Sequence, residues 1–286
     1  MRYEAPGSVD EAVALLADAN GAARVLAGGT DLLVQLRLGL VSPDVVVDIK
    51  NIAETKGITA DGDGFCIGAT VPGAELGENA ELKAAYPGVV EGAELIGSTQ
   101  VQGRATMAGN LCNASPAADS VPALIAAGAT CTVAGPNGQR EVPVGDIPTG
   151  PGTTSLANGE FIVNIKLPAR PANAGDAYLR MIPRTEMDIA IVGAGVNLVL
   201  DGSGTCTAAT VVLGAVGPTT ITVADAGAAL VGTKVDDAAL AAVAAAASAA
   251  ATPIDDKRGT AEYRTKVAGV MASRAAAIAT ERAQKA

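Results

Sequence analysis

The chain has to build its core almost without aromatic side chains. Only 2% of its 286 residues are Phe, Trp or Tyr, and none is tryptophan, although 49% of the residues are hydrophobic. The interior must therefore pack from Ala, Val, Leu and Ile. The 34 glycines exceed ordinary usage and indicate many tight turns, or close approaches between the backbone and a ligand. A chain of this length can bury a sizeable core and suits two or three small domains.

Charge and residue usage exclude several classes of function. The formal net charge of -10 disfavours a nucleic-acid-binding protein, because such proteins need basic clusters to neutralise phosphates. Histidine is absent, which removes the commonest general base and the commonest zinc ligand. The four cysteines are too far apart for an iron–sulfur or zinc motif: Cys66, Cys112, Cys131 and Cys206. We therefore predict no catalytic side chain and no metal site on this chain.

The sequence predicts a location in the cytoplasm. The N-terminus, Met-Arg-Tyr-Glu-Ala-Pro, lacks the apolar region of a signal peptide. No uncharged apolar run approaches the roughly 20 residues of a membrane span. Isolated cysteines suit a reducing compartment.

The first 56 residues have the pattern of a small α/β unit. Ser8-Val9-Asp10-Glu11 is a capping box that predicts a helix over 8–19, ended by Asn20-Gly21. The next segments predict a strand, a glycine turn, a helix and a second strand, over 24–27, 28–31, 32–38 and 45–49.

Residues 57–170 predict a second α/β unit. An Asn137-Gly138 turn indicates a hairpin of 130–134 with 140–144. A long stretch rich in Gly, Ser, Thr and Asn, 97–119, is expected to be irregular. The other expected elements are strands over 65–70 and 161–167 and helices over 75–85, 88–96 and 120–127.

Residues 171–286 predict an α+β domain that follows a linker over 168–175. Strands come first and helices after them, which is typical of this class. The expected strands cover 177–182, 189–200 and 206–216, and the expected helices cover 222–231, 236–251 and 260–282.

A first motif, Val25-Leu26-Ala27-Gly28-Gly29-Thr30-Asp31-Leu32, joins a strand to a helix through two glycines. Such a turn can expose successive backbone N–H groups that hold a diphosphate without any lysine. The same turn can equally be a purely structural connection. It matches neither G-x-G-x-x-G nor G-x-x-x-x-G-K-(S/T), so a Rossmann or P-loop assignment is unsupported.

A second motif, Thr106-Met107-Ala108-Gly109-Asn110, lies about 75 residues later and continues to Asp119. Thr106 and Asn110 offer side-chain hydrogen bonds to a ligand. Asp119 precedes a helical run, so its alternative role is that of a helix N-cap.

Together the two motifs resemble those of the FAD-binding subunit of the xanthine dehydrogenase / carbon monoxide dehydrogenase family of molybdenum hydroxylases. That family has A-G-G-T-(D/H)-L near residue 30, then T-x-G-G-N followed by A-S-P-x-x-D, and the likeness covers nearly the whole chain. The chain departs at Ala108, where the family commonly has glycine, and alanine fits there if its φ is negative. The resemblance implies an α+β fold. It consists of a two-part FAD-binding domain of the PCMH/vanillyl-alcohol-oxidase-like type (1–56 and 57–170) and a C-terminal antiparallel sheet with helices (171–286).

The resemblance also implies which residues bind FAD. The backbone amides of the first motif are expected to cradle the diphosphate: Ala27, Gly28, Gly29, Thr30, Asp31 and Leu32. The second motif is expected to contact the diphosphate from the other side through Thr106, Gly109 and Asn110, with Ala108 in the same cofactor-binding loop. Asp119 is expected to accept hydrogen bonds from ribityl or ribose hydroxyls. Ile162 is expected to pack by the flavin, with the Arg180 cation near the isoalloxazine edge and Ile189 as an aliphatic shield. Arg184, Glu186 and Asp188 are alternatively plain surface ion pairs.

The function implied by the resemblance is electron transfer. A small partner subunit would hold two [2Fe-2S] clusters, and a large partner subunit would hold the molybdenum cofactor and oxidise the substrate. This chain would pass electrons from the clusters through FAD to NAD, quinone or oxygen, within a dimer of heterotrimers (a heterohexamer). A stand-alone FAD-dependent oxidoreductase and an assembly protein that has lost FAD are the alternatives.

Overall fold

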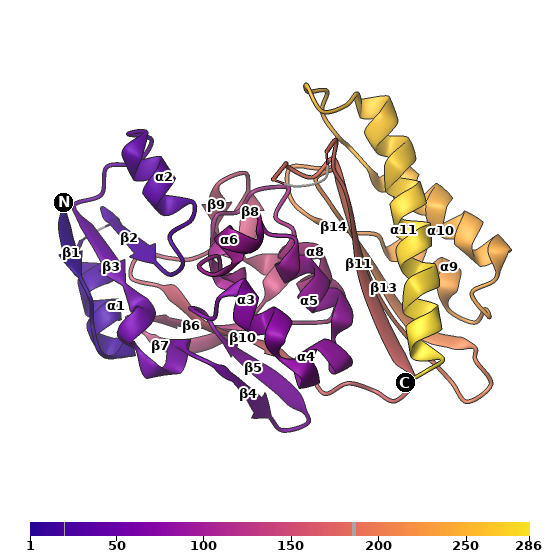
Figure 1. Cartoon of the computed structure of the whole chain (residues 1–286), viewed down its shortest axis with the longest axis horizontal. Helices are drawn as coiled ribbons and strands as arrows, with labels where there is room; N and C mark the ends of the chain where they lie inside the picture. The colour runs from indigo at the N-terminus through magenta and orange to yellow at the C-terminus, as the bar shows by residue number, and fades with distance from the viewer. Residues whose placement is uncertain (20, 185–186) are drawn as a thin grey trace.

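The computed structural model describes residues 1–19, 21–184 and 187–286. Its elements form a row of three larger sheets, with helices packed against them and a small two-stranded sheet beside them (Figure 1). The N-terminal sheet is parallel, in the order β1-β3-β2, and its central strand β3 is buried along its whole length. Ser8 caps α1 as expected, since its Oγ accepts from Glu11 N at 3.3 Å. The part of this prediction that concerns Asn20 lies outside the described residues. The elements are β1 (Arg2–Glu4), α1 (Val9–Asp18), β2 (Ala23–Leu26), α2 (Leu32–Arg37) and β3 (Val45–Asp48).

The middle of the chain forms a five-stranded antiparallel sheet, in the order β4-β5-β10-β6-β7. Its strands are β4 (Ile58–Asp61), β5 (Gly64–Gly68), β6 (Thr130–Gly135), β7 (Gly138–Pro143) and β10 (Phe161–Leu167), with a separate two-stranded pair β8 (Pro148–Gly150) and β9 (Thr153–Thr154). Its helices are α3 (Gly73–Glu78), α4 (Ala80–Ala85), α5 (Pro87–Glu94), α6 (Thr99–Gln102), α7 (Met107–Cys112) and α8 (Ser120–Ala126).

Two expectations for this part of the chain were wrong. The single helix expected over 75–85 is two helices, because Asn79 interrupts it and its Oδ1 caps the second helix by accepting from Leu82 N at 2.8 Å. The stretch expected to be irregular, 97–119, contains α6 and α7. Both helices have six residues or fewer, so tertiary packing rather than local propensity has to stabilise them.

The C-terminal part is an antiparallel sheet covered by helices, which confirms the expected arrangement. The long helix α11 runs along β11 and β12 (Figure 1). Most of its alanines are buried, and a Cβ on Gly175 of β11 would lie 1.9 Å from the Ala279 carbonyl oxygen. Small residues thus let helix and sheet approach closely where aromatic side chains are lacking. The elements are β11 (Ala174–Met181), β12 (Val192–Leu200), β13 (Cys206–Gly214), β14 (Ile221–Thr222), α9 (Ala224–Leu230), α10 (Asp237–Ala250) and α11 (Ala261–Ala283).

Buried and half-buried charges link the C-terminal sheet to the middle of the chain. Asp176 of β11 is 3% exposed and accepts from the backbone N of Gly88 at 2.9 Å and from Arg170 at 2.9 Å. Glu91 of α5 accepts from the backbone N of Tyr178 and pairs with Arg282 of α11. Because buried carboxylates need such partners, these contacts fix how the two parts pack together.

None of the helices in the described part of the chain combines the length and the apolarity that crossing a membrane requires.

Candidate functional site

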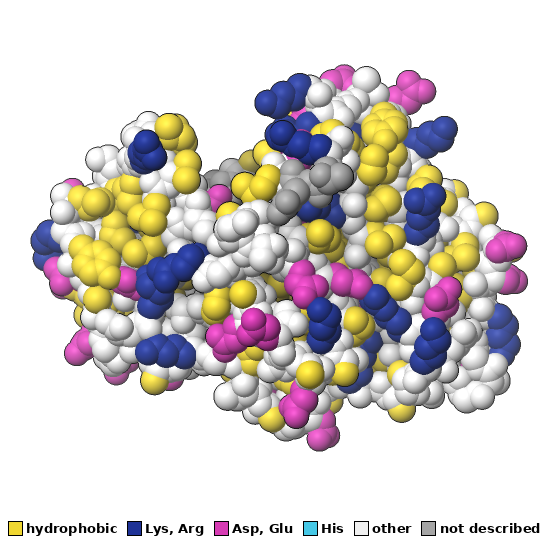
Figure 2. Space-filling model, viewed as in Figure 1, with side chains coloured by type: hydrophobic (Ala, Val, Ile, Leu, Met, Phe, Trp, Pro, Cys, Tyr) yellow, Lys and Arg dark blue, Asp and Glu magenta, His cyan; other side chains and the backbone are white. Residues whose placement is uncertain are grey.

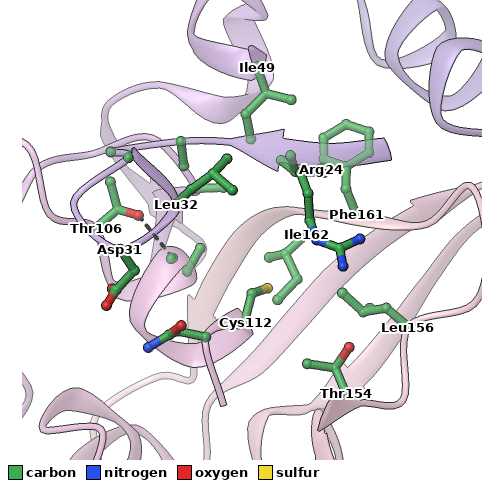
Figure 3. Close-up of a pocket in the computed structure, with 18 of the residues that line it drawn as sticks. Arg24, Asp31, Leu32, Ile49, Thr106, Cys112, Thr154, Leu156, Phe161 and Ile162 are labelled. Atoms are coloured by element: carbon green, nitrogen blue, oxygen red, sulfur yellow. Dashed lines mark hydrogen bonds between the residues drawn. The ribbon is translucent and has the colours of Figure 1, made fainter. Parts of the chain in front are cut away.

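A cavity of about 770 Å³ lies between the two motifs and strand β10 (Figure 3). This volume is within the range of small-molecule and cofactor sites. Every residue of the first loop, 27–32, lines this cavity. The second loop, residues 106–110, contributes Thr106, Ala108, Gly109 and Asn110, and β10 contributes Ile162. The structure therefore brings most of the predicted site residues together around one cavity.

The two loops are pressed against each other at Gly28. A Cβ at this position would lie 1.9 Å from the Arg104 carbonyl oxygen, two residues before the second loop. Gly29 has φ +81, a conformation that favours glycine. The first glycine is thus required for the close approach of the loops and the second for the turn.

The first loop leaves its backbone donors free. Among the described residues, the N–H groups of residues 28–32 donate to no backbone or side-chain acceptor. The helix that follows is anchored by later amides, since Leu33 N donates to the Gly29 oxygen at 3.0 Å and Gln35 N to the Asp31 oxygen at 2.9 Å. Because unpaired N–H groups are costly unless solvent or a ligand satisfies them, this run of donors suits an anionic ligand.

The second loop uses its polar side chains within the protein. Thr106 caps α7, since its Oγ1 accepts from Gly109 N at 2.9 Å (dashed line in Figure 3). Asn110 Oδ1 accepts from the Ser120 N at 3.2 Å and the Ser120 Oγ at 2.8 Å. Ala108 lies inside α7 and is not among the residues with positive φ, so alanine fits at this position without backbone strain.

Asp119 does not cap α8 with its side chain, so that alternative was wrong. Its buried carboxylate accepts instead from Arg180 at 3.0 Å and from the Tyr178 hydroxyl at 3.3 Å. Burial raises the pKa of Asp119 to about 6, although Arg180 and Tyr178 oppose the shift. Neither Asp119 nor Arg180 lines the cavity, and Arg180 also donates to the Leu95 carbonyl at 2.7 Å.

Sequence reasoning missed several side chains around the cavity. Cys112, Leu156 and Phe161 give part of its wall an apolar character beside Ile162 (Figure 3). Burial raises the pKa of the Cys112 thiol to about 12, which keeps this thiol neutral. Arg24 contributes a cation to the lining (Figure 3). Phe161 directly precedes Ile162 in β10, so strand alternation would have placed its side chain on the opposite face, and the loop that holds Leu156 carries no periodic signal.

The segment after Arg180 forms surface ion pairs. Arg184 Nε lies 2.9 Å from Asp188, and Arg258 lies 2.8 Å from the same carboxylate. This confirms the ion-pair interpretation for Arg184 and Asp188, whereas Glu186 lies outside the described residues. Ile189 is 53% exposed and does not line the cavity.

Comparisons with known proteins give a consistent result along the chain. Residues 1–170 match the family model described as the FAD binding domain in molybdopterin dehydrogenase. Residues 177–279 match the model of the CO dehydrogenase flavoprotein C-terminal domain.

Individual relatives match over 70% to 99% of the chain. The chain is 36% identical to the carbon monoxide dehydrogenase medium chain of Afipia carboxidovorans, over 99% of this chain and 97% of that protein. It is 35% identical to the putative xanthine dehydrogenase FAD-binding subunit of Escherichia coli, over 70% of this chain and 68% of that protein. Among solved structures, the Cu,Mo-CO dehydrogenase in its cyanide-inactivated form superposes with a TM-score of 0.94 at 36% identity, covering 99% of this chain and 98% of that one. Quinoline 2-oxidoreductase from Pseudomonas putida gives a TM-score of 0.90 at 30% identity, with the same coverage.

Proposed function

Because the chain belongs to the family of FAD-binding medium subunits of molybdenum hydroxylases such as CO dehydrogenase, we propose that it is the electron-transfer subunit of such a complex. One observation carries the assignment of the FAD site within the chain. Five consecutive backbone N–H groups, those of residues 28–32, have no acceptor among the described residues and lie beside a cavity of about 770 Å³. That arrangement fits the diphosphate of a dinucleotide cofactor.

The two loops would hold the diphosphate from opposite sides. The first loop, Ala27 to Leu32, offers main-chain donors, and the second loop offers Thr106, Ala108, Gly109 and Asn110 as its wall. The apolar surface around Ile162 would pack against the flavin ring and keep water away from it.

Asp119 and Arg180 would act from behind the cavity wall. Because Asp119 does not line the cavity, its carboxylate would act indirectly, by holding the Arg180 guanidinium and the Tyr178 hydroxyl in place, rather than by accepting from a cofactor hydroxyl. Arg180 would place a positive charge near the flavin, where a cation stabilises negative charge on the ring. When bound, FAD supplies the redox chemistry, and the protein binds, orients and shields it.

The complex would contain two kinds of partner subunit. We place the iron–sulfur clusters on a small subunit and the molybdenum cofactor on a large one, in a dimer of heterotrimers in the cytoplasm, with NAD, quinone or oxygen as acceptor. An exposed apolar surface supports the existence of partners. Helix α2 has no buried residue, and hydrophobic side chains reach the surface over it (Figure 2). Four apolar residues on it or just after it are more than half exposed: Leu33, Val34, Leu38 and Leu40. Contiguous exposed apolar side chains mark interaction sites.

Two measurements on purified protein test this function. We expect one FAD per chain after reconstitution, seen as flavin absorbance that remains after gel filtration. We also expect iron and molybdenum to co-purify when the chain is isolated from its source with its partners. A wild-type chain that takes up no flavin would contradict the proposal. A flavoprotein that oxidises an organic substrate on its own, without iron or molybdenum, would favour the stand-alone oxidoreductase instead.

A further inference from the structure

Lys50 contacts the first loop from outside the cavity. Its Nζ donates to the Ala27 carbonyl oxygen at 3.1 Å and to Asp48 Oδ1 at 2.7 Å. Asp48 is 6% exposed, and its other carboxylate oxygen accepts from the Tyr3 hydroxyl at 2.5 Å. A chain of polar contacts thus runs from β1, through the end of β3, to the start of the first loop.

Through the peptide between Ala27 and Gly28, the Lys50 contact sets the direction in which the Gly28 N–H points. The described residues contain no cis peptide bond, and in a trans peptide the carbonyl and the next N–H point in opposite directions. Gly28 lines both the large cavity and a smaller one of about 240 Å³, whereas Lys50 lines only the smaller one. Since Lys50 draws the Ala27 carbonyl toward the smaller cavity, the Gly28 N–H faces the larger one.

We propose that Lys50 is a positioning residue for the cofactor diphosphate. It fixes the Ala27–Gly28 peptide so that the first of the five free N–H groups is presented to the ligand before binding. This inference rests on the proposed function, because it assumes that the larger cavity holds FAD. Preorganised donors bind more tightly because their orientation costs no further entropy when the ligand arrives.

Orientation rather than charge is the contribution of Lys50. The Asp48 carboxylate lies nearer to the ammonium group than the loop does, and it offsets the positive charge that a ligand would sense. Burial disfavours the Asp48 anion, but hydrogen bonds from Lys50 and Tyr3 outweigh it and hold its pKa below the usual value. The ion pair is therefore a fixed support for the carbonyl contact.

Affinity of the flavin-free, full-length protein for FAD, measured by quenching of flavin fluorescence, tests the proposal. Lys50→Met should weaken FAD binding by about tenfold, the loss of one charge-assisted hydrogen bond. Lys50→Arg, which keeps a donor, should restore most of the affinity. Lys83→Met is the matched control, because Lys83 also forms a 2.7 Å ion pair, with Glu94, but does not line the cavity. The control should bind FAD like the wild type.

Two further variants separate positioning from folding and from charge. Lys50→Met leaves Asp48 without its cation, so the double variant Asp48→Asn/Lys50→Met removes that buried charge and should show the same loss of FAD affinity. Asp48→Asn alone frees the Lys50 charge and loosens its side chain, so it should not bind FAD more tightly. Tighter binding by Asp48→Asn, or wild-type affinity in the double variant, would overturn the positioning role. A wild-type chain that binds no FAD would defeat the proposed function itself, which is a different result.

Discussion

The two loops around the cavity look alike in sequence but differ in what they offer a ligand. Both are short and contain glycine, and the first also carries the Asp31 carboxyl at the cavity. Among the described residues, the N–H groups of residues 28–32 in the first loop have no acceptor. In the second loop, the Thr106 hydroxyl and the Asn110 amide oxygen already accept hydrogen bonds from α7 and α8. We infer that the first loop grips the diphosphate and that the second loop mainly builds a rigid wall opposite it.

The comparison predicts that backbone changes matter most in the first loop and side-chain changes most in the second. Its strongest test is Gly28→Val. A Cβ there would collide with the Arg104 carbonyl at 1.9 Å, so the loops must separate and the purified protein should contain no FAD. Gly202→Ala is the control, since a Cβ at Gly202 has no atom within 4 Å. Flavin absorbance at one FAD per Gly28→Val chain would show that the loops do not form the site.

The segment that continues the second loop should show a pH-dependent effect on stability through Asp119. Its folded-state pKa of about 6 exceeds the unfolded value, so the folded protein binds more protons than the unfolded one between about pH 4 and 6. The free energy of unfolding of the wild type, relative to Asp119→Asn, should therefore fall by up to about 3 kcal/mol as pH rises through that window. Urea unfolding of both proteins at several pH values measures this difference. A difference that stays constant, or one that rises with pH, would exclude the buried titration of Asp119.

Thr106 should act through its helix cap. Thr106→Val removes the acceptor for Gly109 N and should lower the free energy of unfolding by about 1 kcal/mol. Thr106→Ser keeps the hydroxyl and should stay near the wild type in urea unfolding. If Thr106→Val is as stable as the wild type but binds FAD more weakly, the Thr106 hydroxyl binds the cofactor directly. The second loop would then be more than a rigid wall.

Thr30 should show the smallest effect, because the first loop is proposed to bind through its main chain. Thr30→Ala leaves every N–H of residues 28–32 in place and should change FAD affinity by less than about threefold, well under 1 kcal/mol. Fluorescence titration with FAD measures the effect. A tenfold loss of affinity would mean that the Thr30 side chain also takes part in binding.

Much of the fold could be predicted from local patterns. Strand β10 covers its predicted range of 161–167, and α11 begins and ends within one residue of 260–282. The family resemblance correctly indicated the α+β class and the FAD-binding family. The loops also lie side by side, as two motifs that share one ligand require.

The predictions that failed, and the residues that were missed, involve contacts between residues distant in sequence or elements too short to show a pattern. Asp119 has the local signature of an N-cap, but Arg180, 61 residues later, takes its carboxylate. The short helix α7 was expected to be irregular, because six residues carry too little periodicity. Lys50 follows an apolar strand and gives no sign that strand pairing places it beside Ala27.

Hydrogen–deuterium exchange with and without FAD tests most directly whether the first loop grips the cofactor through its main chain. Amides that gain an acceptor exchange more slowly, so FAD should protect residues 28–32 strongly. The amides of α10 and α11, far from the cavity, should exchange as before. Unchanged exchange at residues 28–32 in protein saturated with FAD would contradict the account.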